Sequence, residues 1–125
     1  MAQEESAAVD VAKAYHRVWT TGDLETAARY LADDIVCHTP AGTLAGTTAV
    51  RAFMAPFAAT LTGSRLLAAH GNGSEALLMY DTASAAVPSA PGAEFYRVRD
   101  GRITQIHIVF DRLPFALARG EVIRV

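Results

Sequence analysis

The sequence contains almost no cysteine, few aromatic residues and no large excess of either charge. Cys37 is the single cysteine among 125 residues, which excludes an internal disulfide framework and a zinc site built from several cysteines. Eleven basic and thirteen acidic residues give a formal net charge of −2, which argues against binding to nucleic acid or to an anionic membrane. No apolar run approaches the roughly 20 residues that a membrane span needs. These absences favour a soluble domain.

Apolar residues make up 51% of the chain, although aromatic residues contribute only 8%. A chain of this length buries roughly two-thirds of its unfolded surface, so one domain over residues 1–125 is expected. Residues 1–5 are acidic and polar, the reverse of the start of a secretory signal, and this indicates cytoplasmic residence. We expect residues 1–5 to be disordered and residues 112–125 to form a C-terminal extension.

Three helices are predicted in the first half of the chain, where apolar residues recur at helical spacing. The first covers residues 6–20 and ends before Gly22, and Asp23 is a candidate N-cap for a second helix over 24–32. Residues 35–39 are β-branched and closed by Pro40, which predicts a strand, and 41–46 predict a loop. Thr47 is a candidate cap for the third helix, in which Pro56 is a possible kink.

The second half of the chain has the pattern of strands. They are predicted over 64–70, 75–86, 93–99 and 102–110, and the Asp100–Gly101 pair is a strong hairpin signal. A short helix over 114–119 and a small strand over 122–125 follow. Three helices followed by antiparallel strands predict an α+β fold.

Several segments in this order resemble the nuclear-transport-factor-two-like superfamily, which includes SnoaL-like polyketide cyclases, ketosteroid isomerases and limonene-epoxide hydrolases. The resemblance is carried by residues 12–25, 30–34, 46–53 and 97–103. It implies a cone-shaped fold, in which three N-terminal helices pack in a strongly curved, mostly antiparallel sheet around an apolar pocket. It also implies a homodimer formed through the outer face of the sheet.

Side-chain alternation along the last predicted strand separates a pocket face from an outer face. His107 and Val109 should point away from the pocket, opposite to their apolar neighbours. The residues expected to line the pocket and bind a small hydrophobic ligand are Trp19, Phe53, Met54, Phe57, Met79, Tyr96, Ile106, Ile108 and Phe110.

Two candidate catalytic residues come from the resemblance to ketosteroid isomerases. Tyr15 matches the tyrosine that these enzymes use to stabilise an oxyanion, and Glu94 falls at their second oxyanion-stabilising acid. A shift of one residue would place Phe95 there instead of Glu94. The alternative interpretations are a core tyrosine and a solvated carboxylate at the start of a strand.

Two further candidates, His38 and Asp81, form a possible base and its orienting group. The general base of the isomerases falls on Thr39, which cannot abstract a proton at neutral pH, whereas its neighbour His38 has an ordinary pKa near 6.5. Asp81 lies among apolar strand residues, where an unpaired carboxylate is costly to bury, so it could orient His38. A locally bonded histidine and an exposed aspartate are the alternatives. At the positions where limonene-epoxide hydrolases have a tyrosine, an arginine and a second acid, this sequence has Val36, Met79 and Ile108.

The sequence therefore predicts a cofactor-free acid–base enzyme, of the isomerase, cyclase or hydrolase type, that acts on a small hydrophobic carbonyl or epoxide compound. A non-catalytic ligand-binding or dimerisation module of the same fold is the alternative. No two histidines have metal-ligand spacing and no glycine-rich phosphate loop is present, so neither a metal nor a cofactor is expected.

Overall fold

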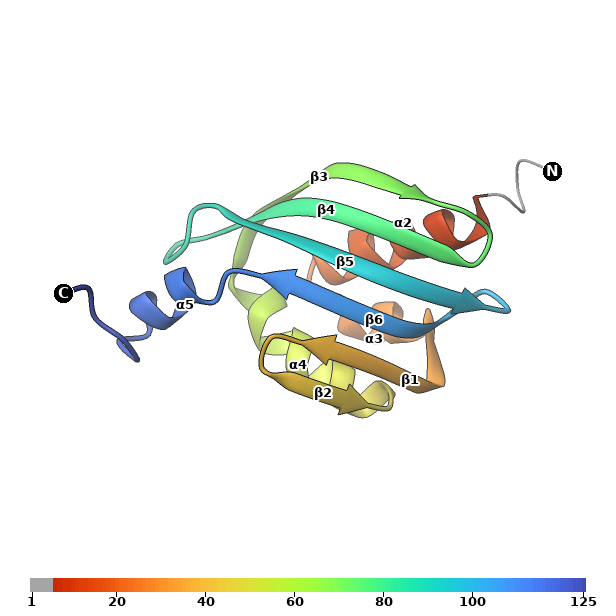
Figure 1. The fold of residues 1–125 in the computed structure, drawn as a ribbon, viewed down its shortest axis with the longest axis horizontal. Helices are drawn as coiled ribbons and strands as arrows, with labels where there is room; N and C mark the ends of the chain where they lie inside the picture. Colours follow the sequence, from red (N-terminus) through yellow and green to blue (C-terminus); the bar gives the residue numbers. More distant parts are fainter. Residues whose placement is uncertain (1–5) are drawn as a thin grey trace.

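The computed structural model describes residues 6–125 as helices packed against one sheet (Figure 1). The expected disorder of residues 1–5 lies outside the described residues. The elements in chain order are α2 (Ala7–Trp19), α3 (Leu24–Ala28), β1 (Leu31–Thr39), β2 (Gly42–Ala45), α4 (Thr47–Thr60), β3 (Leu61–Gly71), β4 (Glu75–Ser84), β5 (Ala90–Arg99), β6 (Arg102–Phe110) and α5 (Leu113–Ala118).

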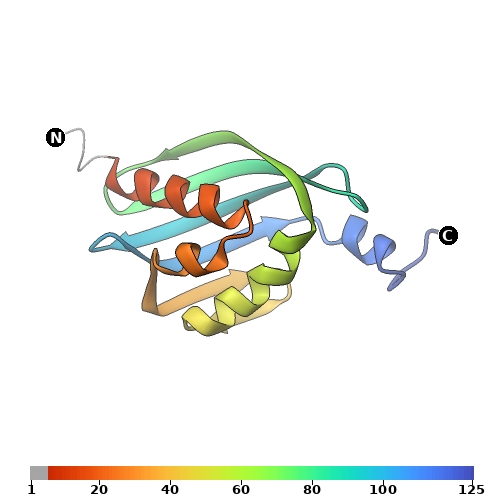
Figure 2. The same cartoon turned by 180° about the vertical axis from the view of Figure 1, so that it is seen from behind.

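The six strands form a single curved sheet in the order β2-β1-β6-β5-β4-β3. Strands β1 and β6 are parallel, and the other neighbouring pairs are antiparallel. Helices α2, α3 and α4 cover one face of the sheet, whereas α5 lies beyond the end of β6 (Figure 2). This confirms the predicted α+β cone, with the core between the three helices and the inner face of the sheet. None of the described helices is long and apolar enough to cross a membrane.

The segment between β1 and α4 is a strand, so the predicted loop over 41–46 is wrong. Residues 42–45 pair with β1 through a tight turn, in which Thr39 Oγ1 accepts the Ala41 and Gly42 N–H groups, each at 3.1 Å. The N-cap of α4 is Gly46 and not Thr47, and its φ of 89° favours glycine. Turn chemistry and backbone pairing outweigh the low strand propensity of this glycine-containing segment.

Two other boundaries differ from the sequence prediction. Helix α3 begins at the predicted cap, where the Asp23 carboxylate accepts the Thr26 N–H at 3.0 Å, but it ends at Ala28 because β1 begins at Leu31 and pairs with β6. No strand forms over 122–125, since these residues are exposed and have no neighbouring strand with which to pair. The predicted short helix is confirmed as α5.

Alternation along β4, β5 and β6 separates the two faces of the sheet, and on β6 the faces of His107 and Val109 and of their apolar neighbours are those predicted. On β6, Ile106 and Ile108 are buried, whereas Val109 is 59% exposed. On β5, Glu94 and Tyr96 are buried on the inner face, and Arg97 is exposed on the other. The inner face thus carries the residues from which a site can be built.

Candidate functional site

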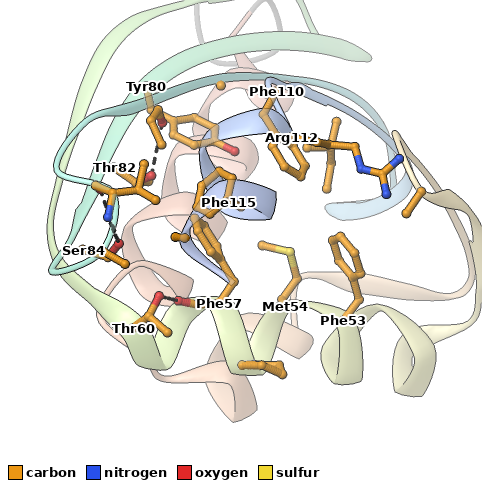
Figure 3. Close-up of a pocket in the computed structure, with 18 of the residues that line it drawn as sticks. Phe53, Met54, Phe57, Thr60, Tyr80, Thr82, Ser84, Phe110, Arg112 and Phe115 are labelled. Atoms are coloured by element: carbon orange, nitrogen blue, oxygen red, sulfur yellow. Dashed lines mark hydrogen bonds between the residues drawn. The ribbon is translucent and has the colours of Figure 1, made fainter. Parts of the chain in front are cut away.

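A cavity of about 760 Å³ lies between α4, α5 and the inner face of the sheet (Figure 3). Most of its wall is apolar. Six residues predicted to line the pocket are found in this wall, together with Glu94: they are Trp19, Phe53, Met54, Phe57, Ile108 and Phe110. The cavity extends from the core toward the end of the sheet where β6 ends and α5 begins.

Glu94 is the buried ionisable acid of the cavity wall. It is 0% exposed, and its carboxylate accepts hydrogen bonds from two phenols: the Tyr80 hydroxyl donates to Oε2, and the Tyr96 hydroxyl donates to Oε1 at 2.9 Å. Burial raises the pKa of Glu94 above its ordinary value, and the two hydrogen bonds partly offset this by favouring the charged form. The wall therefore contains a carboxyl group that holds its proton to a higher pH than an exposed glutamate does.

Tyr80 places a hydroxyl group on the cavity wall beside Glu94. Its ring lies against Gly92, at which an added Cβ would lie 3.2 Å from the Tyr80 hydroxyl oxygen, so the glycine leaves room for the phenol. Burial and the Glu94 charge raise the pKa of Tyr80 well above its ordinary value, so the phenol remains a donor. Sequence reasoning missed Tyr80, although alternation through Leu78, Tyr80 and Thr82 places it on the buried face.

His16 packs behind Tyr80 on the side of α2. Its ring centroid lies 4.7 Å from that of Tyr80, and Ser64 Oγ lies 3.5 Å from His16 Nε2. Burial lowers the pKa of His16 to about 4, so the ring is neutral near pH 7. Its Nδ1 atom has no hydrogen-bond partner among the described residues. This histidine supports the phenol without adding a charge to the site.

Tyr15 lies in the core and is not part of the cavity wall. It is 1% exposed, and its ring meets that of Tyr96 edge-on with centroids 6.2 Å apart. Burial, with a smaller contribution from the Glu94 charge, raises the pKa of Tyr15 well above its ordinary value. Tyr15 is thus in electrostatic range of Glu94 and packs on one of its two donors.

The predicted pair of His38 and Asp81 is not formed. His38 lies on the outer face, with its ring centroid 5.5 Å from that of His107 and its Nδ1 atom 3.3 Å from Thr43 Oγ1. Asp81 is on β4, and strands β6 and β5 separate β4 from β1, which carries His38. The Asp81 carboxylate accepts the Ala90 N–H at 2.9 Å and the Ser89 hydroxyl at 3.0 Å. Because neighbouring Cys37 points inward, alternation turns His38 outward.

Three residues predicted to line the pocket lie elsewhere. Met79 is 47% exposed on the outer face, since it alternates with the inward-facing Leu78 and Tyr80. Tyr96 and Ile106 are both 0% exposed and belong to the packed core beneath the cavity. The prediction that these residues contact a ligand directly is therefore wrong for Met79 and is not supported by the positions of the other two.

The C-terminal segment supplies part of the wall that sequence reasoning missed. The Phe115 ring of α5 meets Phe57 with centroids 5.7 Å apart and Phe110 with centroids 5.8 Å apart. Arg112 and Arg119 also line the cavity (Figure 3 labels Arg112 beside Phe110). The only signal in the sequence was the short helix predicted after β6, and its packing against α4 depends on the tertiary fold.

Among residues 6–125, no group of three or more His, Cys, Asp or Glu side chains could hold a metal ion. The prediction that the chain uses neither a metal nor a cofactor stays a prediction. The acid–base chemistry available in the described cavity is that of the Glu94 carboxyl group and the Tyr80 phenol.

Solved structures of the same fold include proteins of different activities. A crystal structure of a protein from Kribbella flavida is 55% identical, with a TM-score of 0.90 over 93% of this chain and 96% of that one. A steroid delta-isomerase from Pseudomonas aeruginosa is 20% identical, with a TM-score of 0.73 over 94% and 88% of the two chains. A proposed polyketide cyclase from Sinorhizobium meliloti is 17% identical, with a TM-score of 0.70 over 80% and 94%. The last two likenesses show the fold alone.

No curated protein matches the chain. The family model of the SnoaL-like domain does match it, over residues 12–106, which is most of the chain. The chain therefore belongs to the SnoaL-like domain family.

Proposed function

We propose that the chain is a cofactor-free acid–base enzyme that acts on a small hydrophobic carbonyl or epoxide compound bound in the cavity. The observation that carries this proposal is Glu94, a carboxyl group that lines an apolar cavity and is held by two phenols. An ionisable group is costly to bury, and such groups with perturbed pKa values are typical of functional sites.

Glu94 is the group that moves the proton in this proposal. Its raised pKa makes the ionised form a stronger base and the protonated form available as an acid closer to neutral pH. Tyr80 shares the cavity wall, and its single O–H, which donates to Glu94 in this structure, would stabilise negative charge on a ligand oxygen by turning from Glu94 to that oxygen. Tyr96 and Tyr15 support this arrangement from the core: Tyr96 through its hydrogen bond to Glu94, and Tyr15 through its packing on Tyr96.

The test is isomerisation of a series of β,γ-unsaturated ketones of increasing size, followed by the absorbance of the conjugated product. Glu94→Gln keeps the size of the side chain and removes the acid, and we expect it to lower turnover at least about tenfold. Tyr80→Phe should lower it by a similar factor, whereas Glu75→Gln is the matched control and should leave it unchanged, because Glu75 is half-exposed at the start of β4 and pairs with Arg97. Full turnover in both site variants would contradict the proposal.

The second candidate function is ligand binding without catalysis. It is favoured by two observations: both Glu94 oxygens already accept tyrosine hydrogen bonds, and His38 and Asp81 lie outside the cavity. Binding of 2-naphthol at different pH values separates the two functions. An acid–base site that accepts the naphthol O–H should bind it more tightly as the pH rises through the raised pKa of Glu94, and a passive cavity should show a flat profile.

We also propose a homodimer formed through the outer face of the sheet. Leu77, Met79 and Val109 are exposed there by 51%, 47% and 59%, and Met79 and Val109 both pair with Ala93 in the sheet register. Contiguous apolar surface of this kind is typical of protein interfaces. Light scattering after size exclusion should report a dimer that becomes a monomer in Met79→Lys, and a monomeric wild type would overturn this part of the proposal.

A further inference from the structure

Two arginines lie in the wall of an otherwise apolar cavity. Arg112 and Arg119 line it together with Glu94, and these three are the charged residues of the described wall. Guanidinium groups beside apolar surface are suited to ligands that combine a hydrophobic body with an anionic group. The cavity wall therefore has an ionisable acid on β5 and two positively charged side chains on the segment that follows β6.

Arg112 is the arginine with unused donors. Its Nη1 atom donates to the Pro40 carbonyl at 3.4 Å, and no acidic side chain of residues 6–125 lies within ion-pair distance of it, although its charge helps to lower the pKa of Glu121. Arg119 is instead held by the Glu121 carboxylate, at 2.8 Å for Nε and 3.1 Å for Nη2. A guanidinium has five N–H donors, so Arg112 can bind a carboxylate through two of them while it remains anchored on the turn between β1 and β2.

The register of the sheet sets the distance between the two charged ends of the cavity. Glu94 pairs with Ile108, and Gly92 pairs with Phe110, so β6 runs from Glu94 toward Arg112. Arg112 follows Ile108 by four residues, which corresponds to at most about 14 Å between their Cα atoms. A rigid molecule of two or three fused rings is long enough to reach from one group toward the other.

The arginine end of the cavity comes from outside the segment that defines the family. The SnoaL-like domain match covers residues 12–106, whereas Arg112, Phe115 and Arg119 follow it. Phe115 contacts Phe57 and Phe110, which fixes the C-terminal segment on the cavity. This segment is thus placed to determine which ligand the shared fold accepts.

We propose that the cavity selects an amphipathic acid: a fused-ring or similarly rigid apolar compound with an oxygen function at the Glu94–Tyr80 end and a carboxylate that binds Arg112. This inference rests on the proposed function, since it takes the cavity to be the ligand site, and it adds the class of ligand. Arg112 is a ligand-binding residue in this scheme, and the apolar wall formed by Phe53, Phe57 and Phe110 contacts the rings.

The test compares two fluorescent probes, 2-naphthol and 6-hydroxy-2-naphthoate, which differ in a carboxylate opposite the hydroxyl. In wild-type protein at low ionic strength, we expect 6-hydroxy-2-naphthoate to bind at least about tenfold more tightly, the factor typical of a charge-assisted hydrogen bond. Arg112→Gln should abolish this preference and leave the affinity for 2-naphthol within about twofold. Raising the salt concentration should weaken the binding of 6-hydroxy-2-naphthoate alone.

Two further variants separate ligand binding from a structural role of Arg112. Arg51→Gln removes the same charge from the exposed side of α4 and should keep the full preference. Arg112→Lys keeps the charge but loses the planar pair of donors, so it should retain part of the preference.

Equal affinities for the two probes in the wild type, or a preference that survives in Arg112→Gln, would overturn this inference and leave the proposed function standing. Failure of both probes to bind the wild type would overturn both, because the cavity would then not be a site for such ligands.

Discussion

Glu94 on β5 and Asp81 on β4 are carboxylates on neighbouring strands, but they lie on opposite faces of the sheet and differ in burial and in hydrogen-bond partners. Glu94 faces inward, is fully buried and accepts hydrogen bonds from two phenols. Asp81 faces outward and is satisfied locally by Ser89 and the Ala90 N–H. The inner carboxyl has a raised pKa and lies in a cavity wall, so the environment, and not the residue type, makes it the functional candidate.

The largest expected difference between the two faces is in packing. Trp19 is 0% exposed and contacts His16, Phe57 and Tyr80. Trp19→Ala should therefore lower the free energy of unfolding by about 3–5 kcal/mol. Met79→Ala on the outer face should cost less than about 1 kcal/mol in the monomer. Urea unfolding at a fixed, low protein concentration measures both. Similar losses in the two variants would contradict the assignment of the faces.

The next largest effect is on the pH dependence of stability. His16 has its pKa lowered from 6.5 to about 4, so below pH 6.5 the unfolded chain binds a proton that the folded chain does not. The contribution of His16 to stability is therefore fully present above pH 6.5 and is lost as the pH drops toward 4, by about 3 kcal/mol at 1.36 kcal/mol per pKa unit.

Urea unfolding between pH 7 and pH 4 measures this loss, and two variants compare the faces. His16→Phe should remove most of the acid-dependent loss, whereas His38→Ala on the outer face should keep it. If the His38 variant removed the loss and the His16 variant did not, the inner histidine would not be the buried neutral group.

A smaller effect is expected from the partners of the two carboxylates. Tyr96→Phe removes the donor to Glu94 Oε1 and leaves a buried oxygen unpaired, which should cost about 1–3 kcal/mol. Asp81→Asn keeps an oxygen that can accept the Ala90 N–H and should cost less than about 1 kcal/mol. Thermal unfolding of the two variants compares their stabilities directly. A larger loss of stability in Asp81→Asn than in Tyr96→Phe would contradict the assignment of Glu94 as the buried carboxylate and Asp81 as the outward-facing one.

The fold could be predicted from the sequence where apolar periodicity is strong, as in α2 and β6. Strand β2 could not, because its pairing depends on the Thr39 turn and outweighs its weak propensity. The inward position of Glu94 was implied by the resemblance to ketosteroid isomerases, with a shift of one residue to Phe95 left open. The partner of Glu94 was not implied, because Tyr80 reaches it from the neighbouring strand β4 and only the register of β4 and β5 shows this.

The failure of the His38–Asp81 pair has a similar origin. A match of residue types to a family constellation does not decide which face of a strand carries each side chain, and here Cys37 takes the inner position beside His38. The cationic end of the cavity was missed because α5 packs on α4 through Phe115 and Phe57, a contact between residues far apart in the chain.

The central claim is that Glu94 is the proton-active group of a ligand cavity, and the titration of its side-chain carbon by NMR tests this most directly. With ¹³C-labelled glutamate and aspartate, Glu94 should titrate above the ordinary range of a glutamate, and addition of 2-naphthol should change its apparent pKa while Asp81 is unaffected. A Glu94 that titrates at the ordinary glutamate value, or that does not respond to the ligand, would contradict the account.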